Sequence, residues 1–414
     1  MTASASTTRA LITGIGAIAA NGSGTEEWWR ATLEGRSGLS RITGFDTTGY
    51  PAVVAGTVDG FDAAAGNIPG RLAVQTDRWT HFGLTAAELA FADAGLDPKE
   101  LPDYHLGVVT GSSSGGNAFG QREIEKLWSR GPQAVGAYQS IAWFYAATTG
   151  QLSIRNGGRG PCGVLVSEQA AGLDALGQAR RTLAAGDARA VLTGGTEAPL
   201  SPYALVCQGA SGNLSAEPEP ARAYRPFAAD ATGWVPGEGG AILLVEDERA
   251  AAERGAEKSY GYLAGYAATF DPAPGTGRPP ALARAIRQAL ADAGLQPADV
   301  DAVFADAAGV PEQDRAESAA LAEVFGPHGV PVTAPKSMTG RLYAGGGSLD
   351  AAAALLALRD QVLPPTAGTG EPDPAYRIDL VTDGPREARL RTVLVLARGT
   401  GGFNSAVVLR STRD

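Results

Sequence analysis

The sequence has 414 residues, a formal net charge of −10, three histidines and two cysteines. The acidic balance argues against bulk attraction to nucleic acid or to anionic membranes. Two cysteines cannot build a disulfide framework or a four-thiolate zinc site, and His81, His105 and His328 lack metal-ligand spacing, so we expect no metal. With 44% apolar residues, the composition is typical of a globular protein with a large core.

The N-terminal segment lacks the pattern of a signal peptide. Residues 1–8 are polar, and the apolar stretch at residues 10–20 is interrupted by Gly14 and Gly16 without a cleavage site. No run reaches the roughly 18 uninterrupted apolar residues of a membrane span. We therefore expect a soluble, cytoplasmic protein in which Cys162 and Cys207 are reduced, buried thiols.

A heptapeptide at residues 92–98, ADAGLDP, recurs about half a chain later as ADAGLQP at residues 291–297. Each copy ends an Ala-rich helical pattern, with glycine as the stop signal and proline three residues later. Each is followed by a short apolar strand, at residues 106–110 and 302–305. The matching context predicts a duplicated α/β unit whose halves, residues 1–255 and 256–414, join near Gly255.

Five further apolar runs are short and bounded by glycine, which is typical of buried strands. They alternate with helical patterns, which predicts layered α/β structure with parallel or mixed sheets. The runs occupy residues 10–13, 164–166, 190–193, 241–245 and 392–397. After the first run, the pattern G-x-G-x-x-A resembles a dinucleotide-binding fingerprint, but no acidic residue follows in a convincing second strand. We therefore expect no cofactor, and a nicotinamide-dependent oxidoreductase is a weak alternative.

The run at residues 164–166 passes directly into a helix whose apolar positions are Leu173, Leu176 and Leu183. A nucleophile at such a turn would benefit from the positive end of the helix, which lowers a thiol pKa and orients backbone N–H groups. The residue at this turn is Gln169, which carries no ionisable nucleophile. Its amide is either a polar helix cap or a group that faces a site.

Several longer motifs occur in an order typical of ketosynthases. They are residues 10–17 (ALITGIGA), Arg225-Pro226-Phe227 with residues 235–240 (VPGEGG), Gln313-Asp314 with Glu317, residues 336–340 (KSMTG) and residues 399–404 (GTGGFN). With them, the sequence resembles the ketosynthase family of the thiolase superfamily, and most closely its chain length factor branch, the ketosynthase beta subunits of type II aromatic polyketide synthases. The resemblance covers nearly the whole chain and implies a duplicated thiolase-like fold, layered α-β-α-β-α.

The resemblance also implies that all three catalytic positions of an active ketosynthase are changed. Gln169 replaces the cysteine that takes the acyl chain, and Asp306 and Arg341 replace two histidines that assist decarboxylation and stabilise the enolate. If the fold brings Asp306 and Arg341 together, we expect an ion pair that fills the emptied site. The family's lysine is retained as Lys336 and is expected to pair with an acidic group such as Glu317, in a structural role.

The function implied is that of a noncatalytic subunit in a heterodimer with an active ketosynthase alpha subunit, shaping the tunnel that limits polyketide length. An acyl carrier protein with malonyl units would act mainly through the partner, because carrier proteins and this chain are both acidic. Decarboxylating loading domains also carry glutamine in place of the cysteine but keep both histidines. A malonyl-carrier-protein decarboxylase or priming ketosynthase homologue using Gln169, or a condensing enzyme with another nucleophile, is the alternative.

Asn117, Gly120 and Ile124 have spacings of three and four, which place them on one face of a helix. In chain length factors the matching segment lines the tunnel near the dimer interface, where bulky residues stop elongation early. The missing side chain of Gly120 and the non-aromatic Asn117 predict a deeper cavity and a longer product, unless Gly120 serves helix packing.

Three adjacent aromatic residues, Trp143, Phe144 and Tyr145, are by type most often core residues. The resemblance instead implies that they belong to the dimer interface, where aromatic side chains are enriched. We expect His328 to be a solvated loop residue and His81 to be structural.

Overall fold

The structure, a computed structural model, describes residues 8–273 and 275–413. Strands from both halves of the chain form one sheet in the order β13-β11-β10-β15-β16-β9-β1-β8-β7-β5-β6. The N-terminal half contributes β1 (Ala10–Ala19), β5 (Leu106–Gly111), β6 (Cys162–Leu165), β7 (Ala190–Glu197) and β8 (Gly239–Asp247). The C-terminal half contributes β9 (Gly261–Phe270), β10 (Ala302–Phe304), β11 (Pro331–Thr333), β13 (Asp379–Leu380), β15 (Thr392–Gly399) and β16 (Phe403–Arg410).

The two halves repeat one strand arrangement. In the N-terminal half β1 pairs antiparallel with β8 and β8 antiparallel with β7, while β7, β5 and β6 run parallel. In the C-terminal half β9, β16, β15, β10 and β11 repeat this pattern, and β13 adds one more parallel strand at the edge. Strands β1 and β9 join the halves through Leu11 opposite Tyr262 and Ile12 opposite Gly261. The predicted duplication is confirmed, and the proposed boundary at residue 255 falls between α10 (Glu248–Glu253) and β9.

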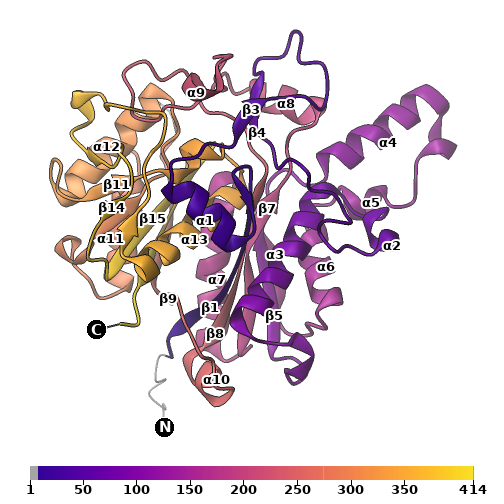
Figure 1. The fold of residues 1–414 in the computed structure, drawn as a ribbon, viewed down its shortest axis with the longest axis horizontal. Coiled ribbons are helices and arrows are strands. Elements are labelled where there is room, and N and C mark those ends of the chain that lie inside the picture. The colour runs from indigo at the N-terminus through magenta and orange to yellow at the C-terminus, as the bar shows by residue number, and fades with distance from the viewer. Residues whose placement is uncertain (1–7, 274, 414) are drawn as a thin grey trace.

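Helices lie between the two half-sheets and on both of their outer faces, which gives the expected α-β-α-β-α layering (Figure 1). The central helices contact strands of both halves, whereas each outer helix packs on one half. The central layer is α7 (Ala171–Ala185) with α13 (Ala344–Asp360), and the outer layers contain α3 (Arg78–Ala94) and α6 (Ala147–Arg155) on one side and α11 (Leu282–Asp292) with α12 (Pro311–Phe325) on the other.

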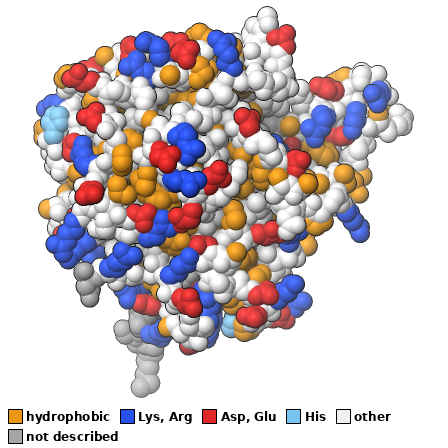
Figure 2. All heavy atoms as spheres, in the orientation of Figure 1, with side chains coloured by type: hydrophobic (Ala, Val, Ile, Leu, Met, Phe, Trp, Pro, Cys, Tyr) orange, Lys and Arg blue, Asp and Glu red, His pale blue; other side chains and the backbone are white. Residues whose placement is uncertain are grey.

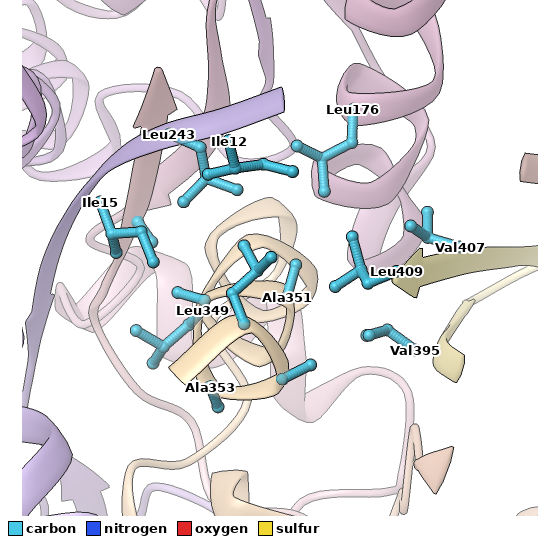
Figure 3. Close-up of a cluster of buried hydrophobic side chains, with 14 of the residues drawn as sticks. Ile12, Ile15, Leu176, Leu243, Leu349, Ala351, Ala353, Val395, Val407 and Leu409 are labelled. Carbon is cyan, nitrogen blue, oxygen red and sulfur yellow. The ribbon is translucent and has the colours of Figure 1, made fainter. Parts of the chain in front are cut away.

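Helix α13 is the centre of the core. All of its residues from Ala344 to Leu358 are buried, as expected for a helix that is apolar or small on every side. Figure 3 shows Leu349, Ala351 and Ala353 of this helix between strands of the two halves. The neighbouring side chains belong to one buried cluster and include Ile12, Ile15, Leu243, Val395, Val407 and Leu409.

The predicted strands are all present, but β9, β11, β13, β16 and the strands of the two-stranded sheets were missed. Strand β9 is rich in glycine and alanine and alternates buried with partly exposed residues, so it offers no apolar run. The G-x-G-x-x-A pattern lies inside β1, where an added Cβ on Gly14 or Gly16 would strike backbone oxygens of α3. These glycines therefore allow a helix to pack closely on the strand.

The remaining elements lie around this framework. Helix α4 projects from the body of the molecule together with α5 (Figure 1). None of the helices within residues 8–273 and 275–413 combines the length and the apolarity that crossing a membrane needs. The smaller elements are α1 (Thr25–Leu33), α2 (Gly70–Ala73), α4 (Asn117–Arg130), α5 (Gln139–Ala142), α8 (Pro202–Gly209) and α9 (Pro220–Ala223), with two-stranded sheets β3 (Leu39–Arg41) with β4 (Val54–Gly56) and β12 (Val362–Leu363) with β14 (Arg386–Glu387).

Candidate functional site

Gln169 lies in a 3-10 turn, Glu168–Ala170, between β6 and α7, as the sequence predicts. The three leucines of α7 are buried and hold the helix in the central layer. Only 7% of Gln169 is exposed, and its side-chain oxygen lies 3.4 Å from where an added Cβ on Gly346 of α13 would be. The N-cap residue of α7 is Ala170. The amide of Gln169 therefore faces inward and does not act as the N-cap.

Asp306 and Arg341 lie side by side in the interior, although they are 35 residues apart in the chain. Arg341 Nη1 is 3.0 Å from Asp306 Oδ2, and Arg341 Nη2 is 3.1 Å from Asp306 Oδ1. Both residues are at most 4% exposed. The predicted ion pair is confirmed, and it is bidentate, which is a strong and geometrically specific contact.

Further bonds hold this pair in place. Asp306 Oδ1 also accepts from the backbone N–H of Arg398 at 2.9 Å. The guanidinium donates to the carbonyls of Asp306 and Arg398 at 2.9 and 3.1 Å and lies 5.5 Å from the ring centre of Trp234. Burial opposes ionisation of Asp306, but the charges of Arg341 and Lys336 outweigh it, so the pKa of Asp306 is lowered. These contacts hold both side chains, apart from Arg341 Nε, against each other and the backbone.

Lys336 forms its ion pair with Asp350 of α13, not with Glu317 as expected. The Lys336 Nζ to Asp350 Oδ2 distance is 2.6 Å, and both side chains are buried. Burial raises the pKa of Asp350 to about 6, against the opposing effect of Lys336. The sequence motif identified the lysine, but several acidic residues were available, and only the packing of α13 decides which one it meets.

Glu317 has a different structural task. Its two carboxylate oxygens accept the backbone N–H groups of Asp306 and Ala307, each at 2.8 Å. Burial and the nearby charge of Asp306 raise the pKa of Glu317. By holding two consecutive N–H groups, Glu317 of α12 fixes the turn on which Asp306 sits.

Non-glycine residues in the left-handed region of backbone conformation lie directly beside Gln169 and Asp306 and two residues after Arg341. The φ angles are 54° for Glu168, 49° for Ala307 and 47° for Tyr343. Such conformations cost of order 1–3 kcal/mol each and cluster at functional sites. Sequence reasoning missed this feature, because none of the three residues is a type that prefers positive φ.

Sequence reasoning also missed Glu168, the residue directly before Gln169. Its Oε2 accepts from the backbone N–H of Gln169 at 2.9 Å and of Thr400 at 2.8 Å, and its Oε1 accepts from Thr400 Oγ1 at 3.2 Å. Burial raises the pKa of Glu168, whereas the charge of Arg341 lowers it. Its position as a charged residue in the turn that carries Gln169 was the feature of the sequence that could have indicated a role at the site.

Three hollows adjoin each other at this site. The cavity nearest α4 has a volume of about 440 Å³, and its lining includes Asn117, Trp143, Glu168, Tyr203, Cys207 and Tyr343. It shares Glu168, Trp234 and Thr400 with a smaller hollow of about 190 Å³ beside Arg341. That hollow in turn shares Asp271, Gln313 and Arg398 with an outer cleft of about 540 Å³. Arg341 therefore lines a small hollow that adjoins a larger one on each side.

The three helix residues predicted as a gate have different surroundings. Asn117 begins α4 and lines the 440 Å³ cavity. Gly120 is buried against Trp143, whereas Ile124 is 44% exposed farther along the helix. The expectation that a missing side chain at Gly120 deepens the cavity is incomplete, because the indole of Trp143 occupies the adjacent space.

Two buried carboxylates hold the start of α4. Glu197, at the end of β7, accepts the backbone N–H groups of Ser113 and Ser114 and, at 2.7 Å, the hydroxyl of Ser114. Asp77 accepts the backbone N–H of Phe119 at 2.7 Å. Burial raises the pKa of both carboxyl groups, and that of Glu197 reaches about 7. The wall that α4 contributes to the cavity is thus fixed from the interior.

The aromatic run is exposed, which contradicts the expectation from residue type that it belongs to the core. Trp143, Phe144 and Tyr145 are 50, 44 and 43% exposed. Cys162 and Cys207 are also exposed and not buried as expected. Cys162 lies on β6, the last strand of the sheet, and Cys207 on α8 beside the cavity. A local sequence pattern could not reveal that these segments lie at an edge.

The two histidines behave as expected. His328 is an exposed loop residue. His81 is partly buried, and its Nε2 lies 3.0 Å from the hydroxyl of Thr76.

Apolar side chains gather on the surface where α4 and α5 project (Figure 2). Strand β6 ends the sheet on this side of the molecule. Exposed apolar side chains that gather on one side of a protein are typical of an interaction surface. The surface called the apolar face below consists of the exposed large hydrophobic residues on α4, α5, α6 and α8 and in the loops that adjoin these helices and β6. They are Ile124, Leu127, Trp128, Tyr138, Ile141, Trp143, Phe144, Tyr145, Ile154, Val166, Tyr203 and Val206.

The chain matches known protein families over most of its length. Residues 7–250 match the family described as "Beta-ketoacyl synthase, N-terminal domain", and residues 260–369 match "Beta-ketoacyl synthase, C-terminal domain". The chain is 59% identical to the "Tetracenomycin polyketide synthase ketoacyl synthase beta subunit" of Streptomyces glaucescens over 97% of this chain and 98% of that protein.

Two solved structures share the fold at full length. "The ishigamide ketosynthase/chain length factor" has a TM-score of 0.90 at 28% identity, covering 98% of this chain and 100% of the other. A type II polyketide synthase acyl carrier protein in complex with its ketosynthase bound to the hexaketide has a TM-score of 0.88 at 29% identity, covering 98% and 99%.

Proposed function

The chain belongs to the β-ketoacyl synthase family as a ketosynthase beta subunit, or chain length factor, of type II polyketide synthases, and we propose that it limits polyketide length as the noncatalytic partner of an active ketosynthase alpha subunit. The observation that carries this proposal is the closed pair of Asp306 and Arg341 beside a glutamine turn. The site holds no thiol and no free base at the three changed positions, while a cavity remains next to it.

The chemistry of condensation requires groups that these positions do not supply. A thiolate must take the acyl chain, and neutral donors must stabilise the enolate. An amide at Gln169 is not a nucleophile, and the pKa of Arg341 is raised further by Asp306, despite the opposing effect of burial. The same ion pair disfavours the alternative of a malonyl-carrier-protein decarboxylase or priming ketosynthase homologue, since that activity is expected to need both histidines.

The apolar face is the proposed docking surface for the ketosynthase alpha subunit. The outer side of β6 ends the sheet, and a strand edge is a template for pairing with another chain. Exposed aromatic residues such as Phe144 and Tyr145 are enriched at the centres of interfaces. The cavity is lined partly by residues of the same face, Trp143 and Tyr203, so a chain growing in the partner could extend into it.

We propose that the acyl carrier protein reaches this subunit mainly through its partner. The carrier protein in one similar structure is in complex with its ketosynthase. This chain has a net charge of −10, which is unfavourable for direct docking of an acidic carrier protein.

The test is reconstitution with the alpha subunit, malonyl carrier protein and product mass analysis. We expect the chain alone to release no carbon dioxide and the complex to form a polyketide of defined length. Asn117→Phe should shorten the product, because it places an aromatic ring in the cavity. Ser129→Phe, an equal change at the exposed far end of α4, is the control and should leave the length unchanged.

Two results would contradict the proposal. Carbon dioxide released by the chain alone, and lost in Gln169→Ala, would favour the decarboxylase alternative. A product of unchanged length in Asn117→Phe, formed by an intact complex, would argue against length control by this cavity.

A further inference from the structure

Gly120 of α4 and Trp143, the C-cap residue of α5, meet in one close contact. A Cβ added to Gly120 would lie 2.8 Å from Trp143 Cδ1 and 3.5 Å from Cγ and Nε1. Carbon atoms without a bond attract best at about 3.5–4.0 Å, so the first of these distances is repulsive. The indole thus occupies the space in which any larger residue at position 120 would lie.

Backbone hydrogen bonds hold Trp143 beside the start of α4. The carbonyl of Trp143 accepts the N–H of Gly116 at 3.2 Å, immediately before the helix begins. A Cβ on Gly115 would lie 2.5 Å from the same carbonyl, and the φ of Gly115 is +64°, so this turn favours glycine. Trp143 also donates its own N–H to Gln139 at 3.3 Å. The backbone of Trp143 is therefore held within this subunit, without a contribution from the partner.

Trp143 contributes to the cavity as well as to the surface. It lines the 440 Å³ cavity together with Asn117, and half of the residue is exposed in this subunit. Its two neighbours, Phe144 and Tyr145, are similarly exposed but are not among the residues that line this cavity. Trp143 is thus the member of the aromatic run that borders both the cavity and α4.

We propose that Trp143 is a specificity-determining residue for chain length, and that Trp143 and Gly120 act as one size-matched pair. This inference rests on the proposed function in length control. The bulk that limits the cavity on this side comes from the indole, and the glycine makes room for it. Removing the indole enlarges the cavity, whereas a larger residue at position 120 refills the space only when the indole is absent.

The experiment is a double-mutant cycle in the reconstituted heterodimer, with product mass as the readout. We expect Trp143→Ala to lengthen the product by at least one two-carbon unit and Trp143→Phe to have a smaller effect. Gly120→Leu in the Trp143→Ala background should return the length toward the original. Because the two residues are in contact, their effects on length should not be additive.

Phe270→Ala is the control, because it removes an exposed aromatic ring on β9 that lies outside both the apolar face and the 440 Å³ cavity. It should leave assembly and product length unchanged. An equal lengthening by Phe270→Ala would overturn the inference, since loss of an aromatic ring distant from the cavity would then have the same effect as loss of Trp143.

Assembly is measured for every variant by co-purification with the alpha subunit. If Trp143→Ala does not assemble, Trp143→Phe decides, because it retains an apolar ring on the face. An intact Trp143→Phe heterodimer with an unchanged product would then overturn the inference. If Asn117→Phe shortens the product while the Trp143 series does nothing, this inference fails and the proposed function stands. If neither changes product length, the proposed function itself fails.

Discussion

The ion-paired centre and the apolar face are two regions of one subunit with opposite properties. At the centre, Asp306 and Arg341 bind each other and the surrounding backbone, so their side-chain polar groups other than Arg341 Nε are hydrogen-bonded internally. On the apolar face, β6 ends the sheet and three consecutive aromatic residues are each more than 40% exposed. The polar groups at the centre are thus occupied by bonds within the subunit, whereas the side chains of the apolar face are available to a partner.

The largest effect should come from breaking the centre. Arg341→Met leaves Asp306 as an uncompensated buried charge, so the free energy of unfolding should fall by about 3–5 kcal/mol. Urea denaturation of the purified chain measures the change. Arg159→Met is the control, because its ion pair with Asp103 is more than 60% exposed on both sides and should contribute at most about 1 kcal/mol.

A second variant distinguishes the unpaired charge from the lost packing of Arg341 as the cause of the reduced stability. Asp306→Leu combined with Arg341→Met removes both charges and should be more stable than Arg341→Met alone. Equal stability of the single and double variants would show that loss of the arginine's packing, and not the unpaired carboxylate, dominates.

The next largest effect should come from placing a charge on the apolar face. Val166→Asp puts a carboxylate beside β6, where partner binding would bury it without a counter-charge. We expect affinity for the alpha subunit to fall by about 100-fold, equivalent to about 2.7 kcal/mol. Phe270→Asp is the control: Phe270 is 58% exposed on β9, in the other half of the molecule, and should leave binding unchanged.

The rate of Cys162 alkylation should show whether the partner binds at β6. Cys162 is exposed on β6, so alkylation by iodoacetamide should slow by about tenfold or more when the partner is bound, equivalent to about 1.4 kcal/mol. Mass spectrometry of the Cys207→Ser variant measures Cys162 alone. An equal alkylation rate in the free chain and the complex would place the interface away from β6.

The smallest expected effect concerns pH and the anchoring of α4. Burial raises the pKa of Glu197 from 4.5 to about 7, so the folded state holds more protons than the unfolded state between these values. Its contribution to stability therefore falls as pH rises through this window, by at most about 1.4 kcal/mol per pH unit. Glu197→Gln should make the slope between pH 5 and pH 7 less negative.

Unfolding measurements at several pH values test this slope. The exposed carboxylate of Glu253 provides the control, and Glu253→Gln should retain the slope of the original chain. A slope that is the same in Glu197→Gln and the original chain would show that Asp77 or other buried acids, such as Asp314, account for the pH dependence.

Most of the fold could be predicted from the sequence, because repeated apolar runs and helix stop signals have characteristic spacing. The repeat at residues 92–98 and 291–297 indicated the duplication that the strand order confirms. Strand β9 was missed because its glycines and alanines bury a strand without forming an apolar run. The motifs also located Gln169, Asp306 and Arg341, and the opposite charges of the last two predicted their ion pair.

Contacts between distant segments could not be predicted from the sequence in the same way. Lys336 had several acidic residues available, and the position of α13 selects Asp350. Gly120 alone suggested empty space, but the turn before α4 brings Trp143 against it. The exposure of Cys162 depends on β6 being the last strand, which is a property of the whole sheet.

The sequence by itself thus determined the family and the layered fold, and it predicted that the catalytic groups are replaced. Only the tertiary structure decided which buried charges pair, which aromatic residues are exposed and what fills the space beside Gly120. The physical reason is one of scale. Periodicity assigns a residue to a face of an element, whereas a hydrogen bond or a packing contact depends on differences of a few tenths of an ångström between elements.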